Sequence, residues 1–199
     1  GSRQQAQVSR NKKGNRQKAK GSRGGSPLLP FCLLPFTFCL VPFLLGLSMD
    51  VFDLPAVDAL VRIALAEDLG AGDLTTRLTV PAEKRARAEI AAKENAVIAG
   101  LPLICKVCAA AGGKVDVREQ VSDGTRVASG DVVASLAGPA HTLLATERVI
   151  LNLLQHLSGV ATFTARFVAA VGGSGCRIVD TRKTTPGLRV VEKYAVRVG

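Results

Sequence analysis

The sequence predicts a mixed α/β protein whose last residues begin an α/β barrel or a doubly wound sheet. Three observations support this. Apolar residues recur at helical spacing in 54–65 and 146–171, and short Val-rich pieces separated by Asp-Gly and Gly-Asp pairs occupy 114–139. A short strand predicted at 176–180 is followed by a polar loop and then by an amphipathic stretch, which is the order strand, loop, helix.

The first helix is predicted from residue 54 onward. Asp53 is a suitable N-cap, because its short carboxylate can accept a hydrogen bond from a free N–H of the first turn. The glycine-containing break at 70–72 ends the helix. Its apolar face consists of Leu54, Val57, Leu60, Val61, Ala64 and Leu65.

A strand is predicted within 86–100, and a short apolar helix over 101–111 ends at two glycines. This helix carries Cys105 and Cys108 in a C-x-x-C spacing, which can serve redox chemistry or supply half of a zinc site. Because no second pair follows, the simpler interpretation is an apolar helix with two small thiols.

From residue 146 to about residue 171 the chain is predicted to be helical. The helical spacing over 146–171 is interrupted at Ser158-Gly159, where a second helix can start. After the strand at 176–180, an amphipathic helix is predicted over 187–198.

The formal charge of +10 is concentrated at the front of the chain. Residues 1–48 contain eight Lys and Arg and no Asp or Glu, whereas residues 49–199 contain eighteen basic and sixteen acidic residues, a net charge of +2. A strongly basic domain would suggest a nucleic-acid partner. The near-neutral globular part argues against one.

The polar residues 1–26 are predicted to be disordered, because they cannot bury enough apolar surface to offset the entropy of ordering. The apolar run 28–47 is long enough to span a bilayer, but three prolines lie inside it. Three interpretations of 1–48 stay open: a non-native upstream or cloning segment, since the only Met is Met49; a targeting segment; or a membrane span. We expect no membrane partner and a cytoplasmic location, with organelle targeting as the alternative.

The strongest candidate site is residues 180–187, Asp-Thr-Arg-Lys-Thr-Thr-Pro-Gly, here called the cationic loop. It lies between a predicted strand and a predicted helix, where barrel enzymes place their active groups. Arg182 offers a planar fork for a carboxylate or phosphate, and Lys183 offers a compact positive charge. A solvated basic turn is the structural alternative.

Arg148 is a second candidate. It follows Glu147 near the start of an otherwise apolar helix, where an Arg beside a carboxylate commonly forms a structural ion pair. It would bind an anion only if it converged with the cationic loop.

Several separate motifs follow one another along the chain: Glu67-Asp68-Leu69-Gly70-Ala71-Gly72-Asp73-Leu74-Thr75-Thr76, Gly138-Pro139-Ala140, Thr146-Glu147-Arg148-Val149-Ile150-Leu151-Asn152, Gln155-His156-Leu157-Ser158-Gly159-Val160-Ala161-Thr162, Asp180 to Arg189, and Glu192-Lys193-Tyr194-Ala195-Val196-Arg197. In this order they resemble the quinolinate phosphoribosyltransferases, also called nicotinate-nucleotide pyrophosphorylases (carboxylating). The resemblance runs from about residue 49 to the last residue.

The resemblance implies an N-terminal α/β sandwich domain at 49–150 and the start of an incomplete α/β barrel at 151–199. It implies phosphoribosyl transfer from phosphoribosyl pyrophosphate to quinolinate, with Mg²⁺ as cofactor. Pyrophosphate and CO₂ leave, and nicotinate mononucleotide forms for NAD biosynthesis.

The resemblance also implies roles for individual residues. Thr181, Arg182 and Lys183 would bind substrate, with Lys183 toward the phosphates. Arg148 would reach a quinolinate carboxylate in the neighbouring subunit's site, since the family's active site forms across a homodimer. Motifs that the family carries on later strands do not occur in this sequence, so the chain by itself is expected to be an inactive fragment. The two histidines, His141 and His156, are read as packing or surface residues.

Two other functions remain open from the residues. One is a related phosphoribosyltransferase acting on nicotinate or another aromatic acid. The other is a non-catalytic module, because 121–139 resembles the hairpins of lipoyl or biotinyl carriers, although it has no lysine at a hairpin tip. A membrane-anchored basic interaction protein would depend on residues 1–48 alone.

Overall fold

The computed structural model describes residues 50–70 and 72–199, so every expectation about residues 1–48 lies outside the described residues. In chain order the elements are η2 (Val51–Asp53), α2 (Pro55–Leu69), α3 (Leu74–Thr79), β1 (Arg85–Ala91), β2 (Ala96–Val97), α4 (Pro102–Ala110), β3 (Asp116–Glu119), β4 (Arg126–Val127), β5 (Val132–Pro139), α5 (Ala140–Ala170) and α6 (Arg189–Val198). The predicted mixture of helices and short strands is confirmed.

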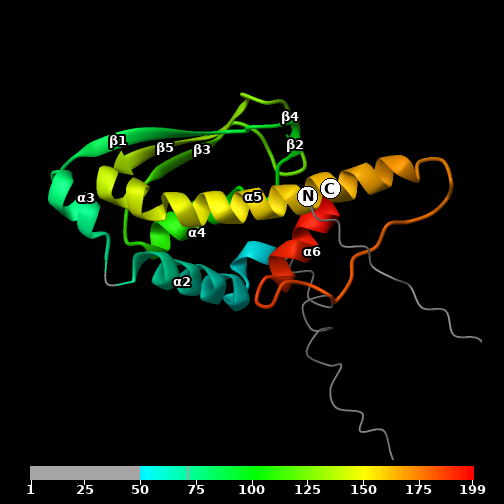
Figure 1. Cartoon of the computed structure of the whole chain (residues 1–199), viewed down its shortest axis with the longest axis horizontal. Coiled ribbons are helices and arrows are strands. Elements are labelled where there is room, and N and C mark those ends of the chain that lie inside the picture. The colour runs from blue at the N-terminus through cyan, green and yellow to red at the C-terminus, as the bar shows by residue number, and fades with distance from the viewer. Residues whose placement is uncertain (1–49, 71) are drawn as a thin grey trace, which may run out of the picture. The chain divides into compact units, whose positions relative to one another are not determined.

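The strands form an antiparallel sheet of three strands in the order β1-β5-β3, and β2 pairs separately with β4. Leu136 in the central strand β5 faces Ala88 of β1 on one side and Val117 of β3 on the other. The long helix α5 runs along the sheet, and α2 lies on the far side of α5 from the sheet (Figure 1). This sheet and its helices form the predicted α/β sandwich.

One hydrophobic core holds these layers together. The fully buried large side chains come from α4 and the residue before it, from α5, from α2 and from α6, so the four helices share this core. They include Leu101, Leu103, Ile104, Val107, Leu157, Val57, Val61 and Val191. At about 1.5–3 kcal/mol for each fully buried side chain, this core stabilises the fold more than any surface contact does. The helix face predicted for 54–65 is confirmed at Val57, Val61 and Leu65.

The glycine between β2 and α4 has a steric role. Gly100 has φ +102°, and a Cβ at this position would lie 2.8 Å from Leu157 Cδ1. Its N–H donates to Asp123 Oδ2 at 2.8 Å. Only glycine allows the chain to turn here against α5.

The predicted interruption at Ser158-Gly159 is wrong, because α5 is one unbroken helix of 31 residues. The Ser158 hydroxyl accepts the N–H of Ala99 at 3.1 Å, and one turn later the Thr162 hydroxyl accepts the N–H of Val97 at 2.8 Å. Polar residues in the helix therefore serve a neighbouring strand and do not end the helix. The expected domain boundary at 150/151 falls inside α5.

The prediction of Asp53 as the N-cap of the first helix is also wrong. Asp53 ends the short helix η2, and Asp50 accepts the N–H of Phe52 at 3.0 Å. Helix α2 begins at Pro55 with no side-chain cap. Proline lacks an N–H and suits the first helical position, so one backbone group fewer needs a hydrogen-bond partner at this end of the helix.

The strand predicted at 176–180 is wrong as well. These residues are irregular and exposed, and no strand among the described residues pairs with them. An extended segment becomes a strand only when a neighbour takes its backbone hydrogen bonds. The helix predicted after it is confirmed as α6, and the strands and turns expected within 86–139 are confirmed as β1 to β5.

The two cysteines of the C-x-x-C lie on α4, with Cys105 exposed and Cys108 buried. Burial raises the pKa of the Cys108 thiol, which favours its neutral, unreactive form. Across the described ranges, no three His, Cys, Asp or Glu side chains are grouped to hold a metal ion. Within the same ranges, no helix has the length and apolar composition needed to cross a bilayer.

Candidate active site

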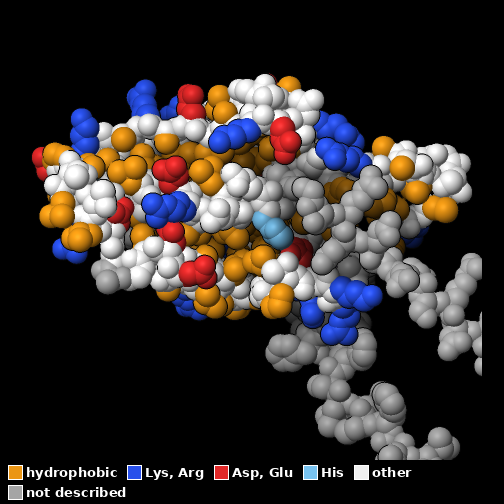
Figure 2. Space-filling view, in the orientation of Figure 1, with side chains coloured by type: hydrophobic (Ala, Val, Ile, Leu, Met, Phe, Trp, Pro, Cys, Tyr) orange, Lys and Arg blue, Asp and Glu red, His pale blue; other side chains and the backbone are white. Residues whose placement is uncertain are grey.

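The cationic loop lies on the surface directly before α6. Thr181, Arg182 and Lys183 are all exposed, and Lys and Arg side chains gather over this part of the molecule (Figure 2). The Lys183 N–H donates to the Thr181 hydroxyl at 3.1 Å, which closes a local turn. Two cations are therefore presented to solvent on a short, folded stretch of backbone.

The first turn of α6 fixes the middle of the cationic loop. Arg189 donates from Nε to the Thr184 hydroxyl at 3.1 Å and from Nη2 to the Arg182 carbonyl at 3.4 Å. Gly187, with φ +83°, lets the chain turn into the helix. The Arg189 guanidinium is thus hydrogen-bonded to the cationic loop.

Glu192 holds the end of the same loop. Its Oε2 accepts the Thr185 N–H at 3.1 Å, and its Oε1 lies 2.8 Å from His156 Nε2 on α5. Burial opposes ionisation of Glu192, but the hydrogen bonds from Thr185 and His156 outweigh burial and hold its pKa below the usual value. The ionised form is therefore the one that holds the loop.

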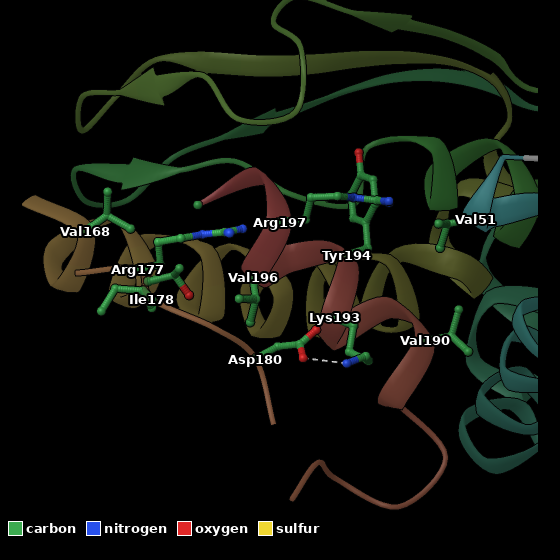
Figure 3. Close-up of a pocket in the computed structure, with 12 residues that line it drawn as sticks. Val51, Val168, Arg177, Ile178, Asp180, Val190, Lys193, Tyr194, Val196 and Arg197 are labelled. Atoms are coloured by element: carbon green, nitrogen blue, oxygen red, sulfur yellow. Dashed lines mark ion pairs between the residues drawn. The ribbon is translucent and has the colours of Figure 1, made fainter. Parts of the chain in front are cut away.

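A cavity of about 720 Å³ separates the exposed segment 177–180 from α6. Asp180 crosses it to pair with Lys193 at 2.5 Å, and Arg197 lies 5.3 Å from the centre of the Tyr194 ring (Figure 3). Val168 and Ile178 supply apolar walls. Of the cationic loop, Asp180 lines this cavity, and Arg182 and Lys183 lie outside its lining.

Arg148 lies elsewhere on α5. Its Nη1 pairs with Asp68 of α2 at 3.6 Å, and its side chain is 77% exposed. It precedes His156 by eight residues, or about 12 Å along the helix axis at 1.5 Å per residue. Among residues 50–70 and 72–199, no hydrogen bond or ion pair joins Arg148 to the cationic loop. The structure brings Thr181, Arg182 and Lys183 together, and leaves Arg148 apart from them.

Sequence reasoning missed the contacts of His156 and Glu192. His156 is exposed, as the sequence predicts for a surface residue, and its Nε2 lies within hydrogen-bonding distance, 2.8 Å, of Glu192 Oε1 on the neighbouring helix. One signal was present: Arg189, Glu192 and Lys193 recur at three- and four-residue spacing, so they share the face of α6 that meets the loop.

The fold is of the class seen in solved structures of nicotinate-nucleotide pyrophosphorylases. The structure is similar to NadC from Streptococcus pyogenes, with a TM-score of 0.70 and 42% identity, covering 74% of this chain and 53% of that one. It is also similar to the nicotinate-nucleotide pyrophosphorylase from Francisella tularensis, with a TM-score of 0.69 and 32% identity over 76% and 55% of the two chains.

The sequence comparisons agree with the fold. Residues 73–158 match the family described as quinolinate phosphoribosyl transferase, N-terminal domain, and residues 160–199 match its C-terminal domain. The chain belongs to the quinolinate phosphoribosyltransferase family.

Two curated relatives show how much of the family's length is represented. The chain is 44% identical to a probable nicotinate-nucleotide pyrophosphorylase (carboxylating) of Synechocystis, over 72% of this chain and 48% of that protein. It is 46% identical to the Mycobacterium leprae enzyme of the same name, over 70% and 50%. The chain spans about half the length of the curated relatives it matches.

Proposed function

We propose that the protein carrying this sequence transfers the phosphoribosyl group of phosphoribosyl pyrophosphate to quinolinate, releasing pyrophosphate and CO₂ and forming nicotinate mononucleotide for NAD biosynthesis. The observation that carries the proposal is the cationic loop, whose backbone is fixed by Arg189 and Glu192 while Arg182 and Lys183 project from it. Family membership supports the same activity.

The chemistry of the substrates fits these residues. Quinolinate is a planar dicarboxylate, and the phosphoribosyl donor carries several phosphate charges. A guanidinium fork can hold a carboxylate with two parallel hydrogen bonds, and an ammonium group suits a phosphate. We assign Arg182 and the Thr181 hydroxyl to substrate binding, and Lys183 to the phosphates of the donor.

The reaction requires mainly positioning and charge stabilisation. The ring nitrogen of quinolinate forms a bond to ribose C1 as the bond from C1 to the pyrophosphate oxygen breaks. The carboxyl beside the ring nitrogen then leaves as CO₂; its bonding electrons stay with the ring carbon, which takes a proton. Cations held around both anions lower the barrier by orienting them and by stabilising charge on the departing pyrophosphate.

We propose that Arg148 binds a quinolinate carboxylate in the site of a second subunit. Two features support this role: its side chain is largely exposed, and its ion pair with Asp68 is long at 3.6 Å. A surface pair of this kind contributes little stability, so Arg148 can exchange it for a substrate carboxylate. This role implies a homodimer or a higher homo-oligomer with shared sites.

Mg²⁺ is proposed as the cofactor, arriving with the phosphoribosyl donor. The described residues offer no group of three ligands that would hold it, and Asp180 is already paired with Lys193. Mg²⁺ is commonly bound through substrate phosphates and water with few protein ligands. We assign no side chain of this chain to the metal.

We propose a reducing compartment, the cytoplasm first, because Cys105, Cys108 and Cys176 are free thiols. An organelle is the second candidate, since an Arabidopsis thaliana relative is named chloroplastic and a Nicotiana tabacum relative is named mitochondrial.

The carrier-module interpretation of 121–139 has less support. β5 is the central strand of the sheet and contributes Val133, Ala134 and Leu136 to the shared core. The segment is therefore an integral part of the sandwich.

The discriminating experiment measures CO₂ release and mononucleotide formation by the full-length protein, with quinolinate and with nicotinate as substrates. We expect product from quinolinate, and expect Arg148→Ala to reduce quinolinate use more than any nicotinate use. Arg62→Ala, at an exposed position of α2, is the matched control. Equal loss for the mono-acid would favour the related phosphoribosyltransferase, and absence of product with either acid would refute the proposal.

A further inference from the structure

One chain of contacts across two helices ties the end of the cationic loop to the core. His156 on α5 contacts Glu192 on α6, and Glu192 accepts the backbone N–H of Thr185 in the loop. We propose that His156 and Glu192 are positioning residues that hold the cationic loop in its binding shape and thereby set the affinity for the polyanionic phosphoribosyl donor. This inference rests on the proposed function.

The two ends of this chain of contacts differ in rigidity. His156 lies in the middle of a helix of 31 residues, and the next residue, Leu157, is fully buried in the core. Thr185 lies in an exposed stretch without regular structure. Glu192 therefore transfers the fixed position of α5 to the end of the loop, while Arg189 and Lys193 hold the rest of the loop to α6.

The Glu192 side chain is suited to this task. It is only 12% exposed, and its two oxygens are used in opposite directions, one toward α5 and one toward the loop. Val191 and Ala195 on the same helix are buried, so α6 cannot rotate to release the contact without disturbing the core. Lys193, which pairs with Asp180, holds the other end of the loop from the same helix.

The contacts of Glu192 with His156 and Thr185 should raise the affinity for the donor, because they reduce the conformational entropy that the loop loses on binding. An unfixed loop has to be ordered when it closes on the donor, and ordering side chains and backbone weakens binding. A loop that is already held loses less entropy on binding. Arg182 and Lys183, the residues assigned to the substrates, lie two or three residues from the held Thr185.

The first test measures the loop without any substrate. Trypsin cleaves after Arg182 and Lys183, so its rate at these bonds reports how often the loop opens. In the full-length protein we expect Glu192→Ala and His156→Ala to speed cleavage there about fivefold or more. Glu67→Ala, at an exposed position of α2, should leave the rate unchanged. Unchanged cleavage in both loop variants would overturn the proposal.

The second test separates positioning from overall stability. We expect both variants to raise KM for phosphoribosyl pyrophosphate about fivefold or more, with a smaller change in kcat. Glu192→Gln keeps an acceptor for the Thr185 N–H and should restore most of the affinity. If Glu192→Ala fails to fold, the exposed His156→Ala decides. Faster cleavage with an unchanged KM would overturn the proposal. A wild-type protein without activity would refute the proposed function. In that case the cleavage rates alone would test whether His156 and Glu192 fix the conformation of the loop.

Discussion

The phenol of Tyr194 on α6 donates a hydrogen bond of 2.7 Å to Asp123, in the turn between β3 and β4. The same carboxylate accepts the N–H groups of Gly100 at 2.8 Å and Leu101 at 3.1 Å. One side chain therefore joins α6 to the start of α4. Burial, followed by the contact with Asp123, raises the pKa of Tyr194, so the phenol keeps its proton and remains a donor.

Replacing Tyr194 with Phe should cost about 1–2 kcal/mol of unfolding free energy, because one hydrogen bond to a charged acceptor is lost. The edge-to-face contact with Phe52, with ring centres 4.7 Å apart, is retained in this variant. Chemical denaturation of wild type and variant measures the difference. A change near zero would mean that solvent replaces the phenol without loss.

Ser158→Ala should destabilise the protein by about 1–3 kcal/mol, because the buried N–H of Ala99 loses its partner. Ser122→Ala, at an exposed turn, is the control. Thermal unfolding followed by circular dichroism checks both. Equal melting temperatures for the two variants would contradict the role given to the α5 hydroxyl.

Asp73 should make stability sensitive to acid. Hydrogen bonds from the Thr76 side chain and backbone lower the pKa of Asp73, and the charges of Arg148 and His141 add to this effect. A group with a lowered folded-state pKa contributes stability above its unfolded pKa, about 3.9 for Asp, and loses it as pH falls through the folded value. The difference in melting temperature between wild type and Asp73→Ala should therefore be largest near neutral pH and should shrink below about pH 4. A difference independent of pH would contradict this.

Residues 49–199 alone should show no turnover, because the family members matched are about twice as long as the part they share with this chain. A coupled assay for nicotinate mononucleotide checks this prediction. Turnover by this segment would show that it contains every group the reaction needs.

The sequence predicted most elements because their signals are local. The apolar spacing that defines α2 and α6 lies within each segment, and the turns around Gly124 and Gly130 are marked by their own residues. The errors were of another kind. Ser158 lies inside the unbroken helix α5, and its hydroxyl bonds to Ala99, fifty-nine positions away. Whether the segment 176–180 forms a strand depends on a neighbouring strand that accepts and donates its backbone hydrogen bonds.

The candidate site shows the same division. The cationic loop could be found from its composition, since Arg182 and Lys183 are adjacent and precede a helix. The connection from His156 through Glu192 to Thr185 could not be found, because it joins three segments that meet only in the folded chain. The separation of Arg148 from the loop could not be found either, because it follows from the unbroken length of α5, which places Arg148 and His156 about 12 Å apart along one helix.

Subunit mixing tests the shared site most directly. Full-length Arg148→Ala and Lys183→Ala variants, each expected to lose most of its activity alone, are unfolded together and refolded as a mixture, with Lys114→Ala, at an exposed position, as an active control. If Arg148 serves the partner's site, half of the dimers are mixed and each mixed dimer has one intact site, so about a quarter of wild-type activity returns. A mixture that remains inactive although mixed dimers form would contradict a site shared between Arg148 of one subunit and the cationic loop of the other.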